Sequence, residues 1–240
     1  MLRLVWVISI SFPFIVYYFF RLSYVELNAE KFTEEKRYGI VRHMARIVMR
    51  NAFVHTKAYG LQKLPEEGGY IMYPNHQGKY DVLGIFHVHE KPCTLVIDEK
   101  RSHLPLANEV TRLLKGVRLD RTDMRNQVES INRIAKEVKE GRRYILFPEG
   151  GYTFNENHLQ DFHAGAFKCA LKSGCPIVPV VIVDSYKVFG SSGLMPVVTQ
   201  VHFLDPIPYE DYRDLKTKEI ALLVKNAIQR KLELLTTPLP

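Results

Sequence analysis

The sequence predicts an α/β protein whose central sheet is mixed and mainly parallel, with helices on both sides. Two observations lead to this fold class. Short apolar segments bounded by turn-forming residues are typical of strands, and the segments between them repeat their apolar residues at helical spacing. Strands that alternate with helices build a sheet that is covered on both faces. The predicted strands are residues 69–74, 93–98, 116–119, 143–147, 177–183 and 197–204.

The predicted helices lie between or after these strands. The clearest covers residues 124–138, where apolar residues recur at helical spacing. Asp120 or Thr122 stands near its start and Gly141 follows its end, as expected of helix boundaries. Further helices are expected from Asp81 onward, over residues 162–172 and over residues 220–232.

The first 60 residues are predicted to form a membrane-associating helical hairpin. Residues 4–20 carry no charge and lie between Arg3 and Arg21. As a helix this segment is about 25 Å long, slightly short of a bilayer core, and Pro13 in its middle predicts a kink. No small-residue cleavage site follows, which argues against a secretory signal peptide. Whether the segment spans the bilayer or dips into one leaflet stays open.

The second helix of the hairpin is predicted over residues 35–53. Its apolar residues recur at helical spacing, and its other faces carry arginines and a histidine. A basic amphipathic helix that follows an apolar segment is typical of a membrane surface. The alternative is a helix that packs on the domain and leaves a basic face in solvent. The α/β domain is predicted to occupy residues 61–240.

Composition and charge narrow the range of partners. The 240 residues are 46% hydrophobic and 25% charged, as in ordinary globular proteins. The net charge of +7 favours anionic lipid headgroups and acidic substrates. No zinc-ligand pattern or other nucleic-acid signature stands out in the sequence, so no nucleic-acid partner is expected. Three scattered cysteines without metal spacing indicate a reducing compartment, no metal site and a domain on the cytoplasmic face of the membrane.

The most informative segment is 75–81, Asn-His-Gln-Gly-Lys-Tyr-Asp, directly after a predicted strand. A histidine can take a proton from a hydroxyl near neutral pH, and a nearby carboxylate can fix its tautomer and stabilise the imidazolium. Residues five apart on one helix do not face each other. The pair therefore requires His76 in the strand-to-helix turn and Asp81 in the first helical turn. Taken alone, the pattern also fits a helix start with an ordinary surface histidine.

Three further blocks follow in order. Residues 116–121 read Gly-Val-Arg-Leu-Asp-Arg, residues 147–153 read Phe-Pro-Glu-Gly-Gly-Tyr-Thr and residues 176–180 read Pro-Ile-Val-Pro-Val. Together with residues 75–81 they resemble the glycerolipid acyltransferase family, whose best-known bacterial members are the 1-acylglycerol-3-phosphate (lysophosphatidate) acyltransferases. The resemblance covers roughly residues 60–210. Four ordered blocks are far more specific than any one of them.

The resemblance implies an acid–base pair. His76 matches the family's general base, which deprotonates a glycerol hydroxyl, and Asp81 matches the carboxylate that orients it. A thioester is already activated, so a base, an orienting carboxylate and a site for the developing oxyanion suffice. Backbone amides near Gly78 are candidates for that oxyanion site. No serine or cysteine nucleophile has an obvious partner beside it, which favours direct attack by the acceptor hydroxyl.

The resemblance also implies substrate-binding residues. Arg121 matches the basic residue taken to hold the phosphate of the acceptor lipid. Glu149 and Gly150 match the third block, also assigned to acceptor binding. Pro179 matches the fourth block, associated with the acyl chain or the acyl donor.

The third block departs from the family pattern. It usually reads Phe-Pro-Glu-Gly-Thr-Arg-Ser, and here Gly151 and Tyr152 stand in the places of threonine and arginine. Tyrosine cannot grip a phosphate bidentately as arginine does. Either Arg121 suffices with Lys79 or Arg118, or the acceptor differs from lysophosphatidate.

These observations predict an enzyme that transfers a fatty acyl chain from acyl carrier protein or coenzyme A to a lysophospholipid hydroxyl. The first candidate acceptor is 1-acylglycerol-3-phosphate, which would give phosphatidic acid. The expected partners are the lipid bilayer, the lysophospholipid and the thioester donor, and no cofactor is expected. The alternatives are another lysophospholipid acceptor, a non-catalytic lipid-binding protein that kept the fold, and a thioesterase or lysophospholipase that uses water.

Two other groups of residues allow a functional and an ordinary interpretation. His87 and His89 with Glu90 could bind a metal, but we interpret them as helix-end and surface histidines. Residues 99–101, Glu-Lys-Arg, either form a solvated loop or contact a headgroup or donor phosphate.

Overall fold

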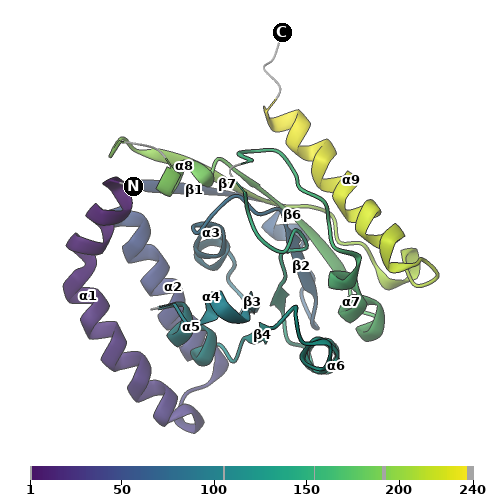
Figure 1. Ribbon diagram of the computed structural model, residues 1–240, viewed down its shortest axis with the longest axis horizontal. Helices are drawn as coiled ribbons and strands as arrows, with labels where there is room; N and C mark the ends of the chain where they lie inside the picture. Colours follow the sequence, from purple (N-terminus) through teal and green to yellow (C-terminus); the bar gives the residue numbers. More distant parts are fainter. Residues whose placement is uncertain (1, 105, 154, 191–192, 237–240) are drawn as a thin grey trace.

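The protein is built around a seven-stranded sheet in the order β1-β7-β6-β2-β5-β3-β4 (Figure 1). The computed structural model describes residues 2–104, 106–153, 155–190 and 193–236. Neighbouring strands are parallel except β6 and β7, which confirms the mixed, mainly parallel sheet. The strands are β1 (Val54–Tyr59), β2 (Ile71–Pro74), β3 (Thr94–Asp98), β4 (Val117–Leu119), β5 (Tyr144–Ile145), β6 (Ile177–Val183) and β7 (Val197–Phe203).

Every predicted strand corresponds to one in the structure, but β1 was not predicted. It pairs with β7 at one edge of the sheet, and its residues alternate between buried and exposed. It precedes residue 61, where the α/β domain was expected to begin. The division of the chain into residues 1–60 and 61–240 stays a prediction.

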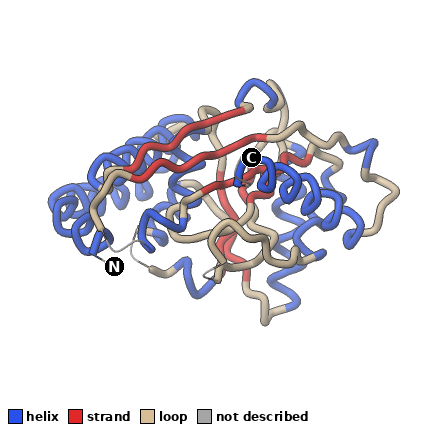
Figure 2. Tube along the Cα trace, turned by 90° about the horizontal axis from the view of Figure 1, so that it is seen from above, coloured by secondary structure: helices blue, strands red, loops and turns tan. Residues whose placement is uncertain are grey.

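Helices cover both faces of the sheet (Figure 1). One side holds α1 (Leu2–Leu27), α2 (Glu34–Asn51), α3 (Asp81–Val88), α4 (Glu99–Ser102) and α5 (Ala107–Leu113). The other side holds α6 (Met124–Lys139), α7 (Lys168–Ser173) and α9 (Thr217–Thr236). Seen from above, the strands run between these two groups of helices (Figure 2). The remaining helical segments are α8 (Tyr186–Gly190) and the 3-10 turns η1 (Ala29–Lys31), η2 (Leu61–Lys63), η3 (Ala164–Phe167) and η4 (Tyr209–Asp211).

Two apolar cores lie against the two faces of the sheet, because successive strand residues point to opposite sides. On β2, Met72 joins the core beneath α2, α3 and α5, whereas Ile71 and Tyr73 join the core beneath α6, α7 and α9. Strand β6 is buried along its whole length, as its unbroken apolar sequence predicts for a central strand. The strands β2 and β6 are therefore packed from both sides.

Helices α1 and α2 form the predicted hairpin, but only α1 exposes an apolar face. Helix α1 continues through Pro13 and, at 26 residues, is about 39 Å long. Val7, Tyr18, Leu22 and Val25 are buried against the protein, whereas most of its other large apolar side chains are exposed. By length and hydropathy it is the one helix of the described residues that could cross a membrane.

The apolar face of α2 packs on the α/β domain instead of facing a membrane. Tyr38, Ile40 and Val41 belong to the core that also contains β2 and α3. His43 and Arg46 are exposed on the opposite face. This packing agrees with the alternative of a packed helix with a solvated basic face, and the membrane association of residues 35–53 stays a prediction. Its apolar stripe is used by the core and is not free for lipid.

Candidate active site

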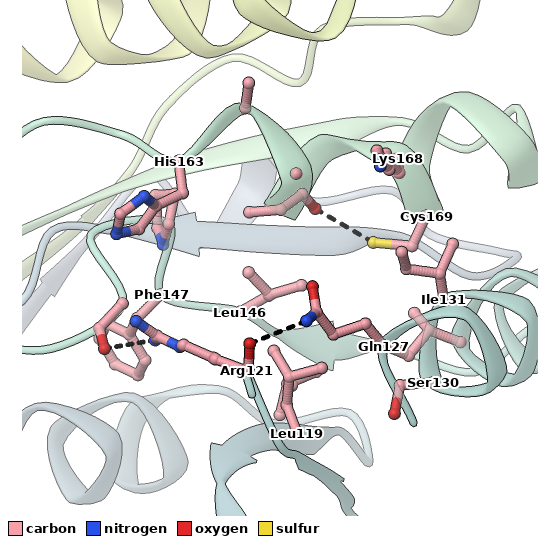
Figure 3. A pocket seen from close by; sticks show the side chains of 17 residues that line it. Leu119, Arg121, Gln127, Ser130, Ile131, Leu146, Phe147, His163, Lys168 and Cys169 are labelled. Carbon is pink, nitrogen blue, oxygen red and sulfur yellow. Dashed lines mark hydrogen bonds between the residues drawn. The ribbon is translucent and has the colours of Figure 1, made fainter. Parts of the chain in front are cut away.

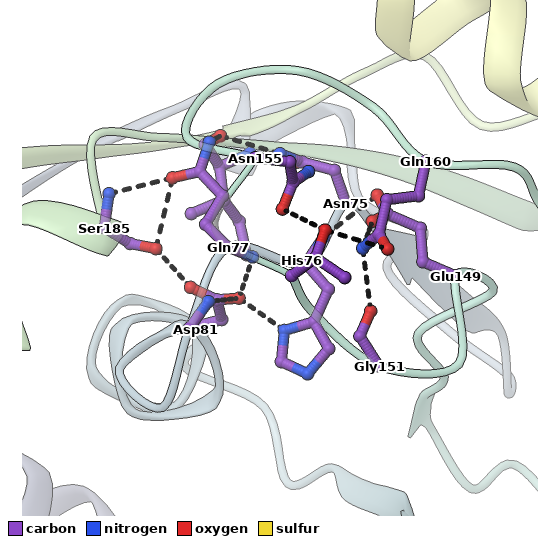
Figure 4. Close-up of polar contacts among 12 residues, drawn as sticks. Asn75, His76, Gln77, Asp81, Glu149, Gly151, Asn155, Gln160 and Ser185 are labelled. Atoms are coloured by element: carbon purple, nitrogen blue, oxygen red, sulfur yellow. Dashed lines mark hydrogen bonds and ion pairs between the residues drawn. The ribbon is translucent and has the colours of Figure 1, made fainter. Parts of the chain in front are cut away.

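His76 and Asp81 meet as the local sequence requires. Strand β2 ends at Pro74 and α3 begins at Asp81, so His76 lies in the turn between them. The imidazole Nδ1 is 2.6 Å from Asp81 Oδ2 (Figure 4). Because Asp81 accepts this bond, Nδ1 carries the proton and the Nε2 lone pair is available to accept another. The predicted placement of both residues is thus observed.

The Asp81 carboxylate is buried and receives further donors. Its Oδ2 accepts the backbone N–H of Gln77 at 2.6 Å and that of Gly78 at 2.9 Å, and its Oδ1 accepts the Ser185 hydroxyl. Bonds from several donors to one carboxylate stabilise its negative charge and hold its orientation. Of the amides near Gly78 that were candidates for an oxyanion site, those of Gln77 and Gly78 are occupied by Asp81, so these two do not supply it.

A layer of amide side chains fixes the loop that carries His76. The Gln77 side chain accepts the Ser185 N–H at 2.9 Å and donates to the carbonyl of Ile182 at 3.0 Å and to Asn157 at 2.7 Å. Asn75 makes a reciprocal pair with the backbone of Ile182 (Figure 4). The loop is therefore tied to the end of β6. None of these roles was predicted, because each depends on a contact about a hundred residues distant in the chain.

Two aromatic rings hold the imidazole. The His76 ring stacks on Phe147 with centroids 4.2 Å apart, and Tyr152 contacts it edge-to-face at 4.9 Å. The His76 side chain is 13% exposed. Its Nε2 has no hydrogen-bond partner among the residues that the structure describes. The ring is held in place while one nitrogen stays open.

Glu149 supports the backbone beside His76. Its Oε1 accepts the His76 N–H at 3.1 Å, and its Oε2 accepts from Gln160 at 2.7 Å. Gln160 also donates to the carbonyl of Gly151. Burial raises the pKa of the Glu149 carboxyl above its ordinary value. This position joins the loop after β2 to the loop after β5.

Gly150 and Arg121 are brought together. Gly150 has φ of +73°, which favours glycine, and a side chain there would overlap the Arg121 guanidinium. Arg121 donates from Nη2 to the Gly150 carbonyl, and its own carbonyl accepts from Gln127 at 2.9 Å (Figure 3). Arg121 is exposed and has no carboxylate partner in the described part of the chain.

Arg121 and Gly150 lie at a cavity of about 360 Å³ that is mostly apolar. Phe147 lines it and also stacks on His76, so one aromatic ring separates the imidazole from the cavity, and His76 itself does not line it. Its wall runs from the ends of β3, β4 and β5 to α6 and the η3 turn (Figure 3). Val96, Leu119, Ile131 and Leu146 supply apolar surface, and Lys168 and His163 supply polar groups.

Lys79 and Arg118 do not line this cavity. Lys79 is exposed two residues before α3 and forms no ion pair with a described residue. Arg118 neighbours Leu119 on β4, and adjacent strand residues point to opposite faces. Its guanidinium is held by Asn108 at 2.8 Å. Of the predicted basic residues, Arg121 alone contacts the cavity.

Pro179 is buried inside β6 and does not line the cavity either. It lies opposite Tyr73 of β2. Ile177 pairs with Ile207 and Val180 pairs with Phe203, so two residues of β6 face three residues after β7. A proline is tolerated at such a bulge because its missing N–H costs no ladder bond there. Its assignment to the acyl chain or donor stays a prediction.

His89 is not a surface histidine. It caps the end of α3, is fully buried, and has both ring nitrogens bonded, to Tyr70 Oη at 2.7 Å and to the Lys91 carbonyl at 2.7 Å. Burial lowers its pKa to about 4. The described residues contain no group of His, Cys, Asp or Glu arranged to hold a metal.

Residues 99–101 form a helical turn, α4, and not the solvated loop that was one of the two predictions. Asp98 caps this turn by accepting the Arg101 N–H at 3.2 Å. The Arg101 guanidinium carbon lies 5.1 Å from the centroid of the Tyr152 ring. Arg101 therefore contacts Tyr152, one of the two rings that hold His76.

The family model described as Acyltransferase matches residues 55–183. The chain belongs to this acyltransferase family. The resemblance read from the four sequence blocks is thereby confirmed. The match begins within β1 and ends with β6, so it includes the whole His76 loop, Arg121 and the Glu149–Tyr152 segment.

Curated relatives and a solved structure extend this result. The chain is 26% identical over 203 residues to the 1-acyl-sn-glycerol-3-phosphate acyltransferase of Saccharomyces cerevisiae, which covers 77% of this chain and 65% of that protein. It is 25% identical over 166 residues to the enzyme of that name from Escherichia coli, covering 69% of this chain and 67% of the relative. The matches span between 40% and 67% of the length of these and other curated relatives. The crystal structure of the 1-acyl-sn-glycerophosphate (LPA) acyltransferase PlsC from Thermotoga maritima has a TM-score of 0.81 at 20% identity, over 100% of this chain and 97% of that one, which shows the shared fold.

Proposed function

We propose that the protein transfers a fatty acyl chain from a thioester donor, acyl carrier protein or coenzyme A, to the free hydroxyl of a lysophospholipid. The proposed acceptor is 1-acylglycerol-3-phosphate and the product is phosphatidic acid, as the names of the relatives suggest. The observation that carries this proposal is the His76 imidazole, which is bonded to buried Asp81 at Nδ1 and has no partner at Nε2 among the described residues. Phe147, which stacks on this imidazole, lines the cavity that also holds Arg121.

The mechanism needs one base and no covalent intermediate. Nε2 of His76 takes the proton of the acceptor hydroxyl as its oxygen attacks the thioester carbonyl. The carbon–oxygen bond forms, the carbon–sulfur bond breaks, and the leaving thiolate receives the proton from the imidazolium. Asp81 stabilises that imidazolium. No cofactor enters these steps.

A covalent alternative is disfavoured by the cysteines. Cys169 lines the cavity, but burial raises the pKa of its thiol to about 12, and the thiolate is the reactive form. The Ser185 hydroxyl is already bonded to Asp81. Direct attack by the acceptor hydroxyl remains as the simplest path.

The acceptor phosphate is proposed to bind at Arg121. This side chain is exposed at the mouth of the cavity, and arginine binds phosphate bidentately. Arg121→Ala should raise the KM for 1-acylglycerol-3-phosphate by about tenfold or more, because a charge-assisted pair is lost. The KM for the donor should stay unchanged, and Arg121→Lys should retain part of the binding. Equal increases in both KM values would contradict the assignment.

The membrane is proposed to be contacted by α1, with the active site on the cytoplasmic face. Phe12, Phe19 and Phe20 are at least half exposed on this helix. Replacing all three by serine should reduce sedimentation with liposomes without disturbing the buried Leu22 and Val25. A triple variant that still sediments quantitatively would exclude α1 as the main contact.

The test of the function is product analysis with a panel of lysolipids and both donor types. Purified protein should form phosphatidic acid from 1-acylglycerol-3-phosphate and a labelled acyl thioester. Free fatty acid formed equally well without acceptor would indicate a hydrolase. Lipid binding without any turnover would indicate a non-catalytic protein, and acylation of another lysolipid alone would correct the acceptor.

A further inference from the structure

We propose that Arg101 is a second cation for the acceptor phosphate and that Tyr152 positions it. On this view Arg101, from a different part of the chain, takes the place of the arginine that the third block lacks. The inference rests on the proposed function and adds to it a residue that determines acceptor specificity.

The first support is the stacking arrangement around Tyr152. The central carbon of the Arg101 guanidinium lies 5.1 Å from the centroid of this ring, and the Tyr152 and His76 rings meet edge-to-face with their centroids 4.9 Å apart. A guanidinium over a tyrosine face is attracted by the ring and loses part of its freedom. Tyr152 thus links Arg101 to the His76 ring.

The second support is the pair of glycines at 150 and 151. Arg121 occupies the space next to Gly150, and Arg101 Nη2 lies 3.8 Å from the position that a Cβ on Gly151 would take. Two guanidinium groups from different strand ends therefore flank one short turn. Neither has a carboxylate partner among the residues that the structure describes.

The third support is the charge balance of the turn. Of the neighbouring carboxylates, Glu149 has both oxygens used, by the His76 N–H and by Gln160, and Asp98 accepts the backbone N–H of Arg101 without pairing with its guanidinium. Glu149 is buried behind the turn, whereas Arg101 and Arg121 are exposed in front of it. Two uncompensated cations beside an open base fit a doubly charged phosphate monoester that carries a nearby hydroxyl.

This arrangement accounts for Tyr152. An arginine at position 152 would place a third like charge beside Arg101 and would remove the ring that holds it. A tyrosine there keeps Arg101 in reach of the turn. Arg101 in α4 then compensates for the arginine that the third block lacks.

The experiment measures acceptor KM, donor KM and kcat for matched variants. Arg101→Ala should raise the KM for 1-acylglycerol-3-phosphate by about tenfold, with the donor KM and the kcat on a neutral monoacylglycerol unchanged. Adding Tyr152→Arg to Arg101→Ala should restore most of the loss. Tyr152→Phe should preserve acceptor binding because the ring remains. Arg213→Ala is the matched control, since Arg213 is exposed beyond η4 and pairs with Asp214.

Three outcomes would overturn the inference: an unchanged acceptor KM in Arg101→Ala, an equal loss with the neutral acceptor, or no recovery in the double variant. Each is scored against a wild-type protein that acylates 1-acylglycerol-3-phosphate. If the wild type does not acylate that acceptor, the proposed function fails instead. The two failures are therefore distinguishable.

Discussion

His76, in the loop before α3, and His89, at the end of α3, show how the same side chain serves different purposes. In both, Nδ1 donates its proton: His76 to the Asp81 carboxylate and His89 to the Lys91 carbonyl. They differ at Nε2. His89 accepts the hydroxyl of Tyr70 there and is fully buried, whereas Nε2 of His76 has no hydrogen-bond partner among the described residues.

The difference lies in what each environment does to the protonated ring. Around His89, burial disfavours the imidazolium and lowers the pKa of His89 to about 4. Around His76, an ionised carboxylate can stabilise an imidazolium that forms and disappears during turnover. A base needs such a partner together with one free nitrogen. His89 has neither, so we assign it to stability and His76 to chemistry.

The largest expected effect is that of Asp81→Asn. The amide keeps the shape but loses the charge that stabilises the His76 imidazolium, so transfer should fall by about 10²- to 10⁴-fold. The backbone N–H groups of Gln77 and Gly78 also lose their carboxylate acceptor, so the melting temperature should fall as well. Turnover within a fewfold of wild type would remove the distinction between the two histidines.

The next effect is on the pH dependence of stability. His89 has a pKa of about 4 when folded and about 6.5 when unfolded, so the unfolded chain binds more protons between these values. The contribution of His89 to the free energy of unfolding is fully present above pH 6.5. It is lost as the pH falls towards 4, and the total loss is about 3 kcal/mol. Denaturant titrations should show this loss in the wild type and a flatter profile in His89→Gln. Identical profiles would contradict the buried neutral assignment.

The smallest effect is expected for Tyr70→Phe. This change leaves Nε2 of His89 without its donor, which should lower the free energy of unfolding by about 1–3 kcal/mol. The kcat of the folded protein should not change, because Tyr70 is buried away from the cavity. A matched loss of kcat would show that the two histidines are coupled.

The sequence predicts elements whose apolar pattern reflects their own burial. β6 and α6 are of this kind, and their limits agree with the prediction to within a few residues. β1 was missed because its inward face includes Thr56, which is bonded to Tyr80 and Thr199, and its outward face carries a histidine and a lysine. The face used by α2 could not be predicted either, because the same apolar stripe fits a membrane and a protein core.

At the candidate site, local spacing predicted the pair and tertiary contacts supplied the rest. His76 and Asp81 lie five residues apart, so their turn and helix could be anticipated. Ser185 and Gln160 reach the site from distant loops, and a polar side chain in a loop gives no signal of its partner. The placing of Arg101 on Tyr152 was likewise visible only in the folded chain.

The most direct test compares the rates at which His76→Ala and His89→Gln transfer a labelled acyl chain from a thioester to 1-acylglycerol-3-phosphate. Each protein is assayed at the same folded concentration, set by circular dichroism. His76→Ala should lose about 10²- to 10⁴-fold in rate, because the base is removed, and His89→Gln should stay near the wild-type rate. Wild-type turnover by His76→Ala, or an equal loss in His89→Gln, would contradict the assignment of His76 as the base.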